Sequence, residues 1–313
     1  MTRYLASRFA GMVIVMLLVA TIVFFITRLA PGDPAAVMLG EQATAADIAK
    51  LRASYGLDQP LPLQFVYWLG ELARGNLGQS IFLQRPVTQA LAERAEPTFF
   101  LTLFSIVIAT TIGIPCGIIA AVWRGKTVDQ LFSGFAMLGA SIPSFWFGLI
   151  LMQIFAVSLG WFPVAGYGDP GVPLSDRLHH LVLPAIVLGV VNSALILRFT
   201  RASMLDVLGE DHIRTARAKG LPEASVILHH ALRNALIPVI TILGLTFALL
   251  IGGAIVTETV FGLPGIGNLV VSAVLRRDYP VIQGALLVIA GLYVLINLLI
   301  DLLYLVVDPR VKY

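Results

Sequence analysis

Side chains that could do chemistry are few in this 313-residue sequence, and the five histidines stand out because four of them form two adjacent pairs. Paired histidines can suggest a metal site. Adjacent residues point to different faces of a helix, however, and no Cys or carboxylate joins either pair at ligand spacing. We therefore expect no metal site and interpret the histidines as residues at a membrane interface. They are His179, His180, His212, His229 and His230.

Catalytic and cofactor-binding motifs are also missing from the sequence. It has no Gly-x-x-x-x-Gly-Lys phosphate loop, so we do not expect this chain to bind or hydrolyse ATP. Gly265 and Gly267 do not form a dinucleotide fingerprint, because they follow an apolar run and lack the third glycine. The single cysteine, Cys116, excludes an internal disulfide and a cysteine-based metal site. The sequence predicts no catalytic residue and no cofactor-binding residue.

Acidic residues inside or beside apolar runs are the next candidates, because ionisable groups are costly in a membrane. Asp301 lies in the last predicted helix, directly after the apolar run over 279–300 and one helical turn after Asn297. We interpret these two as structural polar residues that fix a helix bundle, with a proton relay as the alternative. Glu258 follows another apolar run. It could line an outer opening or brace the loop over 258–280, and the sequence favours neither.

Composition places the chain among membrane proteins. It is 58% hydrophobic and 12% charged, whereas soluble domains carry about 25% charged residues. The net charge of +3 gives no indication of nucleic-acid binding. Each of six apolar runs is long enough to cross about 30 Å of hydrocarbon as a helix. They cover 9–27, 97–123, part of 130–168, 178–197, 234–257 and 279–300.

The distribution of Lys and Arg predicts the orientation. With both termini in the cytoplasm, twelve of the 21 Lys and Arg residues fall on the inside, and the short linkers are basic there. The first apolar run is too long for a secretory signal and lacks a small-residue cleavage site, so we expect it to be retained.

Three regions follow from this topology. Residues 1–96 would hold the first transmembrane helix and an extracytoplasmic segment with two short helices, over 44–56 and 63–74. Residues 97–307 would form a five-helix core with a cytoplasmic loop at 198–233. Residues 308–313 would be a cytoplasmic tail.

The loop at 198–233 is the one long polar insert among the later apolar runs. Good helix formers over 215–219 predict a helix, and Gly220 can adopt the left-handed conformation that ends it. Pro222 can open the next helix. The cations Arg217 and Lys219 suit the end of the first helix. The small residues Ala216 and Ala218 would let a partner surface approach closely.

This insert resembles the cytoplasmic coupling loop of permeases from importer-type ABC transporters. The family pattern is Glu-Ala-Ala, three residues, then Gly. Here Arg214-Thr215-Ala216 replaces Glu-Ala-Ala, and Gly220 has the family spacing. The run Arg-Thr-Ala-Arg-Ala-Lys-Gly and the later Arg-Asn-Ala-Leu-Ile-Pro, ending at Pro238, are typical of the peptide/nickel branch.

Further segments resemble the same branch, as a B-type permease, along nearly the whole chain. They lie at 29–35, 55–60, 75–80, 141–148, 183–189, 257–267, 277–280 and 308–310.

The resemblance implies an all-α polytopic membrane protein with six transmembrane helices and the type I importer permease fold. It implies a permease subunit that forms half of the path for peptides or a similar solute across the inner membrane. Implied partners are a second permease, two ATPase subunits holding ATP and Mg, and an extracytoplasmic solute-binding protein, besides membrane lipid. The coupling residues would be Arg214, Thr215, Ala216, Arg217, Ala218, Lys219 and Gly220.

The later helices line the cavity in related importers, which makes Asn192, Ser193, Thr246, Phe247 and Glu258 candidates for the path. Helix–helix hydrogen bonding is an equally good interpretation of these polar residues. A nickel chelate or glutathione could replace a peptide as the substrate. Two rival classes are an ion-gradient-driven secondary transporter, which would require inverted repeats and broken helices, and a membrane scaffold without transport.

Overall fold

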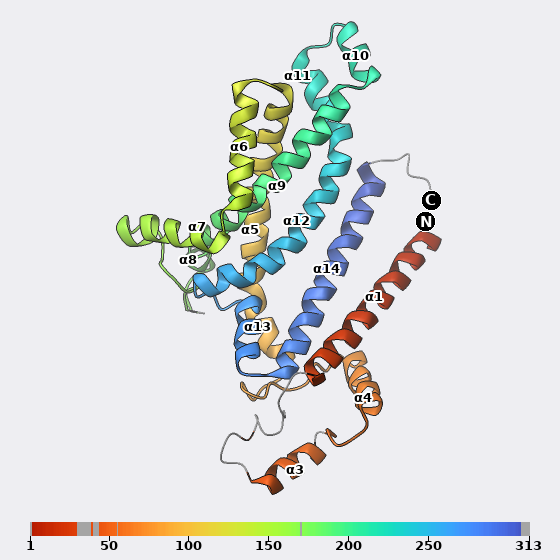
Figure 1. Cartoon of the computed structure of the whole chain (residues 1–313), viewed down its shortest axis with the longest axis vertical. Coiled ribbons are helices and arrows are strands. Elements are labelled where there is room, and N and C mark those ends of the chain that lie inside the picture. Colours follow the sequence, from red (N-terminus) through yellow and green to blue (C-terminus); the bar gives the residue numbers. More distant parts are fainter. Residues whose placement is uncertain (1, 30–38, 40–43, 55, 170, 308–313) are drawn as a thin grey trace. The chain divides into compact units, whose positions relative to one another are not determined.

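A computed structural model describes residues 2–29, 39, 44–54, 56–169 and 171–307 (Figure 1). These residues are mostly helical and contain no strand. The expected tail at 308–313, and most of the family segment at 29–35, lie outside them. The long helices are α1 (Thr2–Leu29), α5 (Val87–Val122), α9 (Val182–Leu208), α12 (Leu232–Val260) and α14 (Tyr279–Val307). The others are α3 (Ala45–Ser54), α4 (Leu61–Ala73), α6 (Thr127–Ser141), α7 (Ser144–Leu151), η1 (Met152–Ser158), α8 (Leu174–His179), α10 (Asp211–Ala218), α11 (Glu223–Ser225), η2 (Val226–Ala231) and α13 (Ile266–Leu275).

The chain forms two compact units. The first comprises Met1–Glu96 and Asn268–Leu295, and the second comprises Pro97–Gly267 and Ile296–Tyr313.

In the first unit, α4 packs on α1 through aromatic side chains. The buried ring of Phe24 lies 5.2 Å from Phe65 and 5.3 Å from Trp68, between centroids. The expected helix start at Thr44 is also present, because Thr44 Oγ1 accepts a hydrogen bond of 3.2 Å from the backbone N–H of Asp47. Gln283 on α14 donates to Thr27 on α1, at 2.6 Å. Both predicted short helices therefore form.

In the second unit, α9 and α12 pack side by side, and α6 packs along α9 (Figure 1). Small residues bring α5 and α9 into close contact. A Cβ at Gly117 would lie 2.6 Å from Thr200 Cβ and 2.8 Å from the carbonyl oxygen of Leu197. A Cβ at Gly113 would meet Ile196 at 2.7 Å. Only glycine permits this approach of the two helices.

The third apolar run is not one straight helix. The helices over Thr127–Ser141 and Ser144–Ser158 meet at an angle of 101°. Pro143 explains the break, because the residue before a proline is disfavoured in the α region, and Ile142 is extended with φ −81° and ψ 124°. Among the described residues, five helices can cross a membrane by length and composition, or six if the bent pair counts as one span.

Candidate coupling site

The predicted helix–turn–helix of the polar insert is present. Helix α10 covers Asp211–Ala218, and Gly220 follows in the left-handed region with φ +77°. Two hydrogen bonds close the helix end, from the N–H of Gly220 to Arg217 O at 2.9 Å and from the N–H of Leu221 to Ala216 O at 3.4 Å. This is the glycine-dependent Schellman arrangement. Helix α11 then starts after Pro222.

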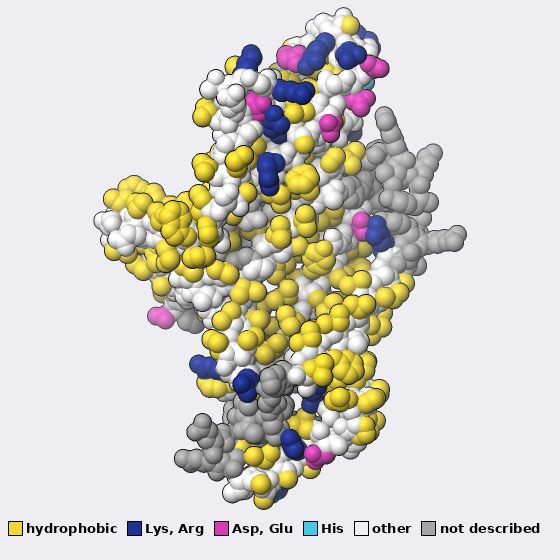
Figure 2. All heavy atoms as spheres, viewed as in Figure 1, with side chains coloured by type: hydrophobic (Ala, Val, Ile, Leu, Met, Phe, Trp, Pro, Cys, Tyr) yellow, Lys and Arg dark blue, Asp and Glu magenta, His cyan; other side chains and the backbone are white. Residues whose placement is uncertain are grey.

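Helix α10 has one buried face and one exposed face. Ile213 and Ala216, three residues apart, are buried with Met204 of α9 and with Val226 and Ala231 of η2. The side chains of Arg214, Arg217 and Lys219 are exposed. Lys/Arg and Asp/Glu side chains gather at this end of the second unit (Figure 2). The apolar face fixes α10 to α9 and η2, so the cationic face has a rigid support.

Burial changes the part expected of Ala216. The sequence suggested that Ala216 and Ala218 together let a partner approach, but Ala216 is only 6% exposed and belongs to the chain's own core. Its small size allows α10 to pack closely on the helices beneath. Ala218 is exposed, so it alone of the two is accessible to a partner.

An ion pair spans the turn. Arg217 donates to both carboxylate oxygens of Glu223, at 2.7 and 3.2 Å, and this partner raises the pKa of Arg217. Both side chains are about half exposed, so the pair contributes roughly 1 kcal/mol at most. Arg214 contacts Asp211 at 3.4 Å, and the Thr215 hydroxyl donates to Asp211 O at 2.9 Å.

The histidines for which contacts are given touch different groups. His180 Nδ1 lies 3.0 Å from the carbonyl oxygen of Gly166, and the ring of His179 lies 5.2 Å from that of Phe162. His212 Nε2 lies 3.2 Å from the amide nitrogen of Asn234. Within the described part of the chain, no three His, Cys, Asp or Glu side chains come together as a metal site.

Of the candidate path residues, Ser193 and Thr246 are buried within the second unit. Ser193 is buried where α9 meets Gly113 of α5, and its hydroxyl donates to Val190 O at 2.7 Å. Thr246 is also buried, with no hydrogen-bond partner for its hydroxyl among the described residues. Asn192 and Phe247 are partly buried, and the Asn192 amide donates to Leu188 O at 2.8 Å.

Glu258 braces a turn within the second unit. It is fully buried, and its carboxylate accepts a 2.6 Å hydrogen bond from Thr98 Oγ1. Thr98 Oγ1 in turn accepts from the N–H of Ile266, at 2.8 Å. A Cβ at Gly265 would overlap the Glu258 carboxyl group, so only glycine fits there. This packing supports the bracing interpretation of Glu258 rather than an opening that it lines.

The two polar residues of α14 are not isolated. Asn297 and Asp301 are both in the second unit, and each interacts with another group.

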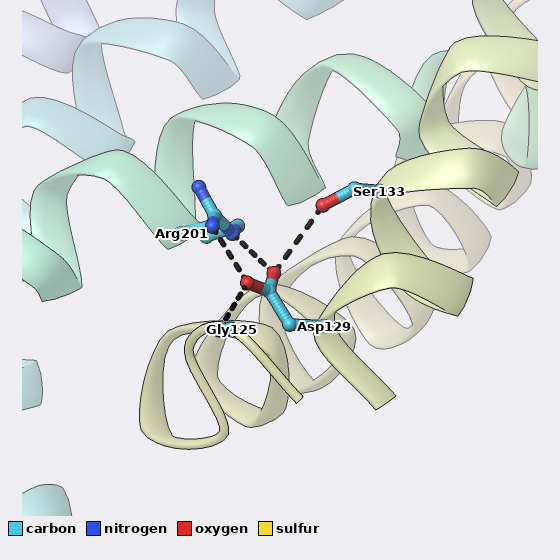
Figure 3. A network of polar contacts seen from close by, with 4 residues as sticks. All are labelled: Gly125, Asp129, Ser133 and Arg201. Atoms are coloured by element: carbon cyan, nitrogen blue, oxygen red, sulfur yellow. Dashed lines mark hydrogen bonds and ion pairs between the residues drawn. The ribbon is translucent and has the colours of Figure 1, made fainter. Parts of the chain in front are cut away.

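A buried ion pair joins α6 to α9 (Figure 3). Arg201 donates from Nε and one terminal nitrogen to the two carboxylate oxygens of Asp129, at 2.6 and 2.8 Å. The same carboxylate accepts from the N–H of Gly125 at 2.9 Å and from the Ser133 hydroxyl at 3.3 Å. The Asp129 side chain is 8% exposed, so four donors satisfy a charge that solvent barely reaches.

Comparison with known proteins gives one consistent family. Residues 113–313 match the family described as binding-protein-dependent transport system inner membrane component, and residues 1–102 match its N-terminal model. This chain belongs to that family.

Relatives similar along the whole permease include the "Probable peptide ABC transporter permease protein y4tP" of Sinorhizobium fredii, 47% identical over 99% of both chains. The glutathione transport system permease protein GsiC of Pectobacterium atrosepticum is 46% identical over the full length of both chains. A structure of the MetNI methionine ABC transporter in inward-facing conformations is 19% identical, with a TM-score of 0.58 over 71% of this chain and 97% of that one. The last likeness concerns the fold alone.

The family decides between the rival classes. The protein is a multi-pass permease subunit of the inner membrane in an ATP-driven importer, with the all-α type I permease fold, and ATP hydrolysis occurs on separate ATPase subunits. A secondary transporter and a scaffold without transport are therefore excluded.

Two features of this permease escaped the sequence analysis. The first is the pair of Arg201 with Asp129, which could not be found from local sequence because the two residues lie 72 positions apart. The spacing Gly113-x-x-x-Gly117 is a signal of close helix packing that a scan for small residues at i and i+4 would have found.

Proposed function

We propose that residues 214–220 form the coupling helix end that docks in a groove of an ATPase subunit, on the cytoplasmic side. The observation that carries this proposal is the two-faced geometry of α10, in which Ile213 and Ala216 are anchored while the cationic face is exposed. A helix fixed to α9 and η2 by buried side chains would carry ATPase closure to the spanning helices as a rigid-body movement.

The complete importer would contain a second permease, two ATPase subunits that hold ATP and Mg, and an extracytoplasmic binding protein, with both permease termini in the cytoplasm. The solute would be a peptide or the peptide-like molecule glutathione. The names of two relatives, at 47% and 46% identity, support this substrate class. The resemblance to the peptide/nickel branch leaves a nickel chelate open as the alternative substrate.

Ala218→Trp tests the docking directly, because Ala218 is small and exposed and a large ring there would obstruct a partner surface. We expect the variant to reach the membrane but to lose ATPase subunits on extraction in mild detergent, as measured by mass spectrometry, and to lose ATP-driven uptake. Ala53→Trp, at an exposed alanine of α3, is the control. Normal ATPase recovery and uptake with Ala218→Trp would refute the docking proposal.

Exchange of the two charges separates docking from stabilisation of the turn. Arg217→Glu removes the pair with Glu223, and a second change, Glu223→Arg, restores a pair of reversed polarity. If Arg217 contacts the ATPase, uptake stays low in the double variant. Recovery of uptake would assign Arg217 to the turn alone.

The substrate class can be tested in vesicles that contain the complete importer and its binding protein. We expect uptake of labelled di- or tripeptides or glutathione to require ATP. Transport restricted to a nickel chelate would contradict the peptide assignment.

A further inference from the structure

A cavity of about 270 Å³ lies in the first unit, at the junction of α13 and α14. Its lining includes two arginines, Arg94 and Arg276, together with Ser272 and Phe82. Nothing in the transport path or the coupling site uses these residues. A concave site with two arginines and a hydroxyl favours an anion.

Asp278 is the one acid among the described residues that line the cavity, and its carboxylate already accepts hydrogen bonds. Asp278 is 2% exposed, and its carboxylate accepts from Ser80 Oγ at 2.5 Å and from the N–H groups of Ile81 and Phe82 at 3.1 Å each. These three donors fix the segment that carries Phe82. The Arg276 guanidinium lies 3.6 Å from the centroid of that ring, which holds it in place. Among the described residues, Arg276 makes no ion pair.

The sequence positions of the two arginines predict that the cavity lies near a membrane surface. Arg276 precedes the membrane-spanning helix that starts at Tyr279 by three residues, and Arg94 precedes the apolar part of α5, which starts at Pro97, by the same number. Arginines at such positions reach the headgroup region of a bilayer.

One exposed apolar side chain lines the cavity, since the Phe82 ring is 56% exposed. Val274 and Leu275 do not line it, but they are 54% and 79% exposed on the neighbouring surface of α13. A ligand that fits both the two arginines and the exposed apolar surface has an anionic head and an apolar body.

We infer that this cavity binds the phosphate of an anionic phospholipid, with Arg94 and Arg276 as the anion-binding groups and with the acyl chains beside the exposed Phe82 ring. The phosphate is the chemistry that the guanidinium groups recognise, and the exposed ring next to the start of a membrane-spanning helix favours a lipid over free phosphate. The site is independent of the coupling proposal, since it requires only that the permease is in a membrane.

The test uses the complete importer, extracted in mild detergent and placed in nanodiscs of phosphatidylcholine with or without phosphatidylglycerol. Phosphatidylglycerol retained per permease is counted by native mass spectrometry. The double variant Arg94→Gln/Arg276→Gln should bind phosphatidylglycerol at least about ten-fold more weakly, since the loss of one charge-assisted hydrogen bond alone weakens binding by a factor of this order. Arg276→Lys keeps the charge but loses the planar stacking on Phe82, and should retain an intermediate amount.

Arg277→Gln is the matched control, because Arg277 is the exposed neighbour of Arg276 and does not line the cavity. Equal lipid loss in this control would show a general charge effect and overturn the site. Unchanged retention in the double variant would overturn it as well. Stabilisation of the wild-type importer by inorganic phosphate alone, as large as that by phosphatidylglycerol, would assign the cavity to a free anion. If the double variant keeps its lipid but loses the binding protein, the surface docks a protein instead.

If the double variant fails to assemble, Arg276→Gln alone decides the question. It leaves Asp278 and its three donors intact. The single variant must still retain less phosphatidylglycerol than Arg277→Gln for the inference to stand.

Discussion

Asp129 shows how a single side chain can hold two helices together where water is scarce. Its carboxylate has four donors, and two of them come from the rigid fork of Arg201 on another helix. A buried pair of this kind adds little compared with apolar packing, but removal of one partner leaves the other charge without compensation. The pair therefore matters for how α6 and α9 fit together.

Asp129→Asn should lower the free energy of unfolding by up to about 3 kcal/mol, because Arg201, whose side chain is 29% exposed, keeps a charge without its counter-ion. Thermal unfolding of the purified importer measures this loss. Arg201→Lys should cost less, since it keeps the charge and loses only the fork geometry.

The exposed pair between Arg74 and Glu71 provides the comparison, with side chains 78% and 46% exposed. Arg74→Gln should change stability by less than about 1 kcal/mol. If Asp129→Asn and Arg74→Gln lower the free energy of unfolding equally, burial does not make the Asp129 pair more important for stability than an exposed pair.

At the scale of elements, backbone geometry decides two features of the permease. The crossing of α5 and α9 depends on glycines that leave no room for a methyl group. The end of α10 depends on a left-handed residue, which glycine adopts without steric cost. Both features lie in the second unit, beside the helices that would transmit movement from the coupling site.

Gly117→Ala should destabilise the permease by about 1–3 kcal/mol, because the new methyl group would lie 2.8 Å from a backbone oxygen that cannot easily move. Gly134→Ala on α6 is the matched control, since a methyl group added there would have no atom within 4 Å. The free energies of unfolding of the two variants, measured by thermal unfolding, should differ clearly. Similar stability would show that α5 and α9 are not in close contact in the membrane.

Gly220→Val should disturb the end of α10, because a β-branched residue in the left-handed region costs about 1–2 kcal/mol. We expect reduced ATP-driven uptake while the protein still reaches the membrane. Gly209→Val, in the same polar insert, has an ordinary φ of −81° and avoids the left-handed strain, so it should reduce uptake less than Gly220→Val does. If both variants transport normally, the turn at Gly220 is not part of the coupling.

At the scale of the whole molecule, the predicted topology puts polar segments on opposite sides of the membrane. The distribution of Lys and Arg predicts that the insert at 198–233 is cytoplasmic and that the segment before residue 97 is extracytoplasmic. The single native cysteine, Cys116, makes this testable because its replacement leaves no other thiol.

In a Cys116→Ser background, Ala218→Cys should react with an impermeant maleimide in inverted vesicles but not in intact spheroplasts. Gln59→Cys, exposed after α3, should show the opposite pattern. Labelling of both cysteines from the same side would contradict the predicted topology.

Much of this permease was predictable from its sequence. Long charge-free runs must become helices in a membrane, because a helix satisfies every backbone polar group internally, and α9, α12 and α14 lie where the runs predicted. Gly220 ends one helix and Pro222 precedes the next because of their local backbone preferences, so the turn between α10 and α11 was also predictable.

The tertiary structure decided what depends on contacts between distant residues. Periodicity did not show that Ala216 belongs to the core, that Glu258 braces a turn through Thr98, or that Arg201 pairs with Asp129. Nor did it show that Arg94 and Arg276, which are 182 positions apart in sequence, line one cavity. Local preference is encoded in neighbouring residues, whereas burial and ion pairing arise only when helices remote in the chain pack together.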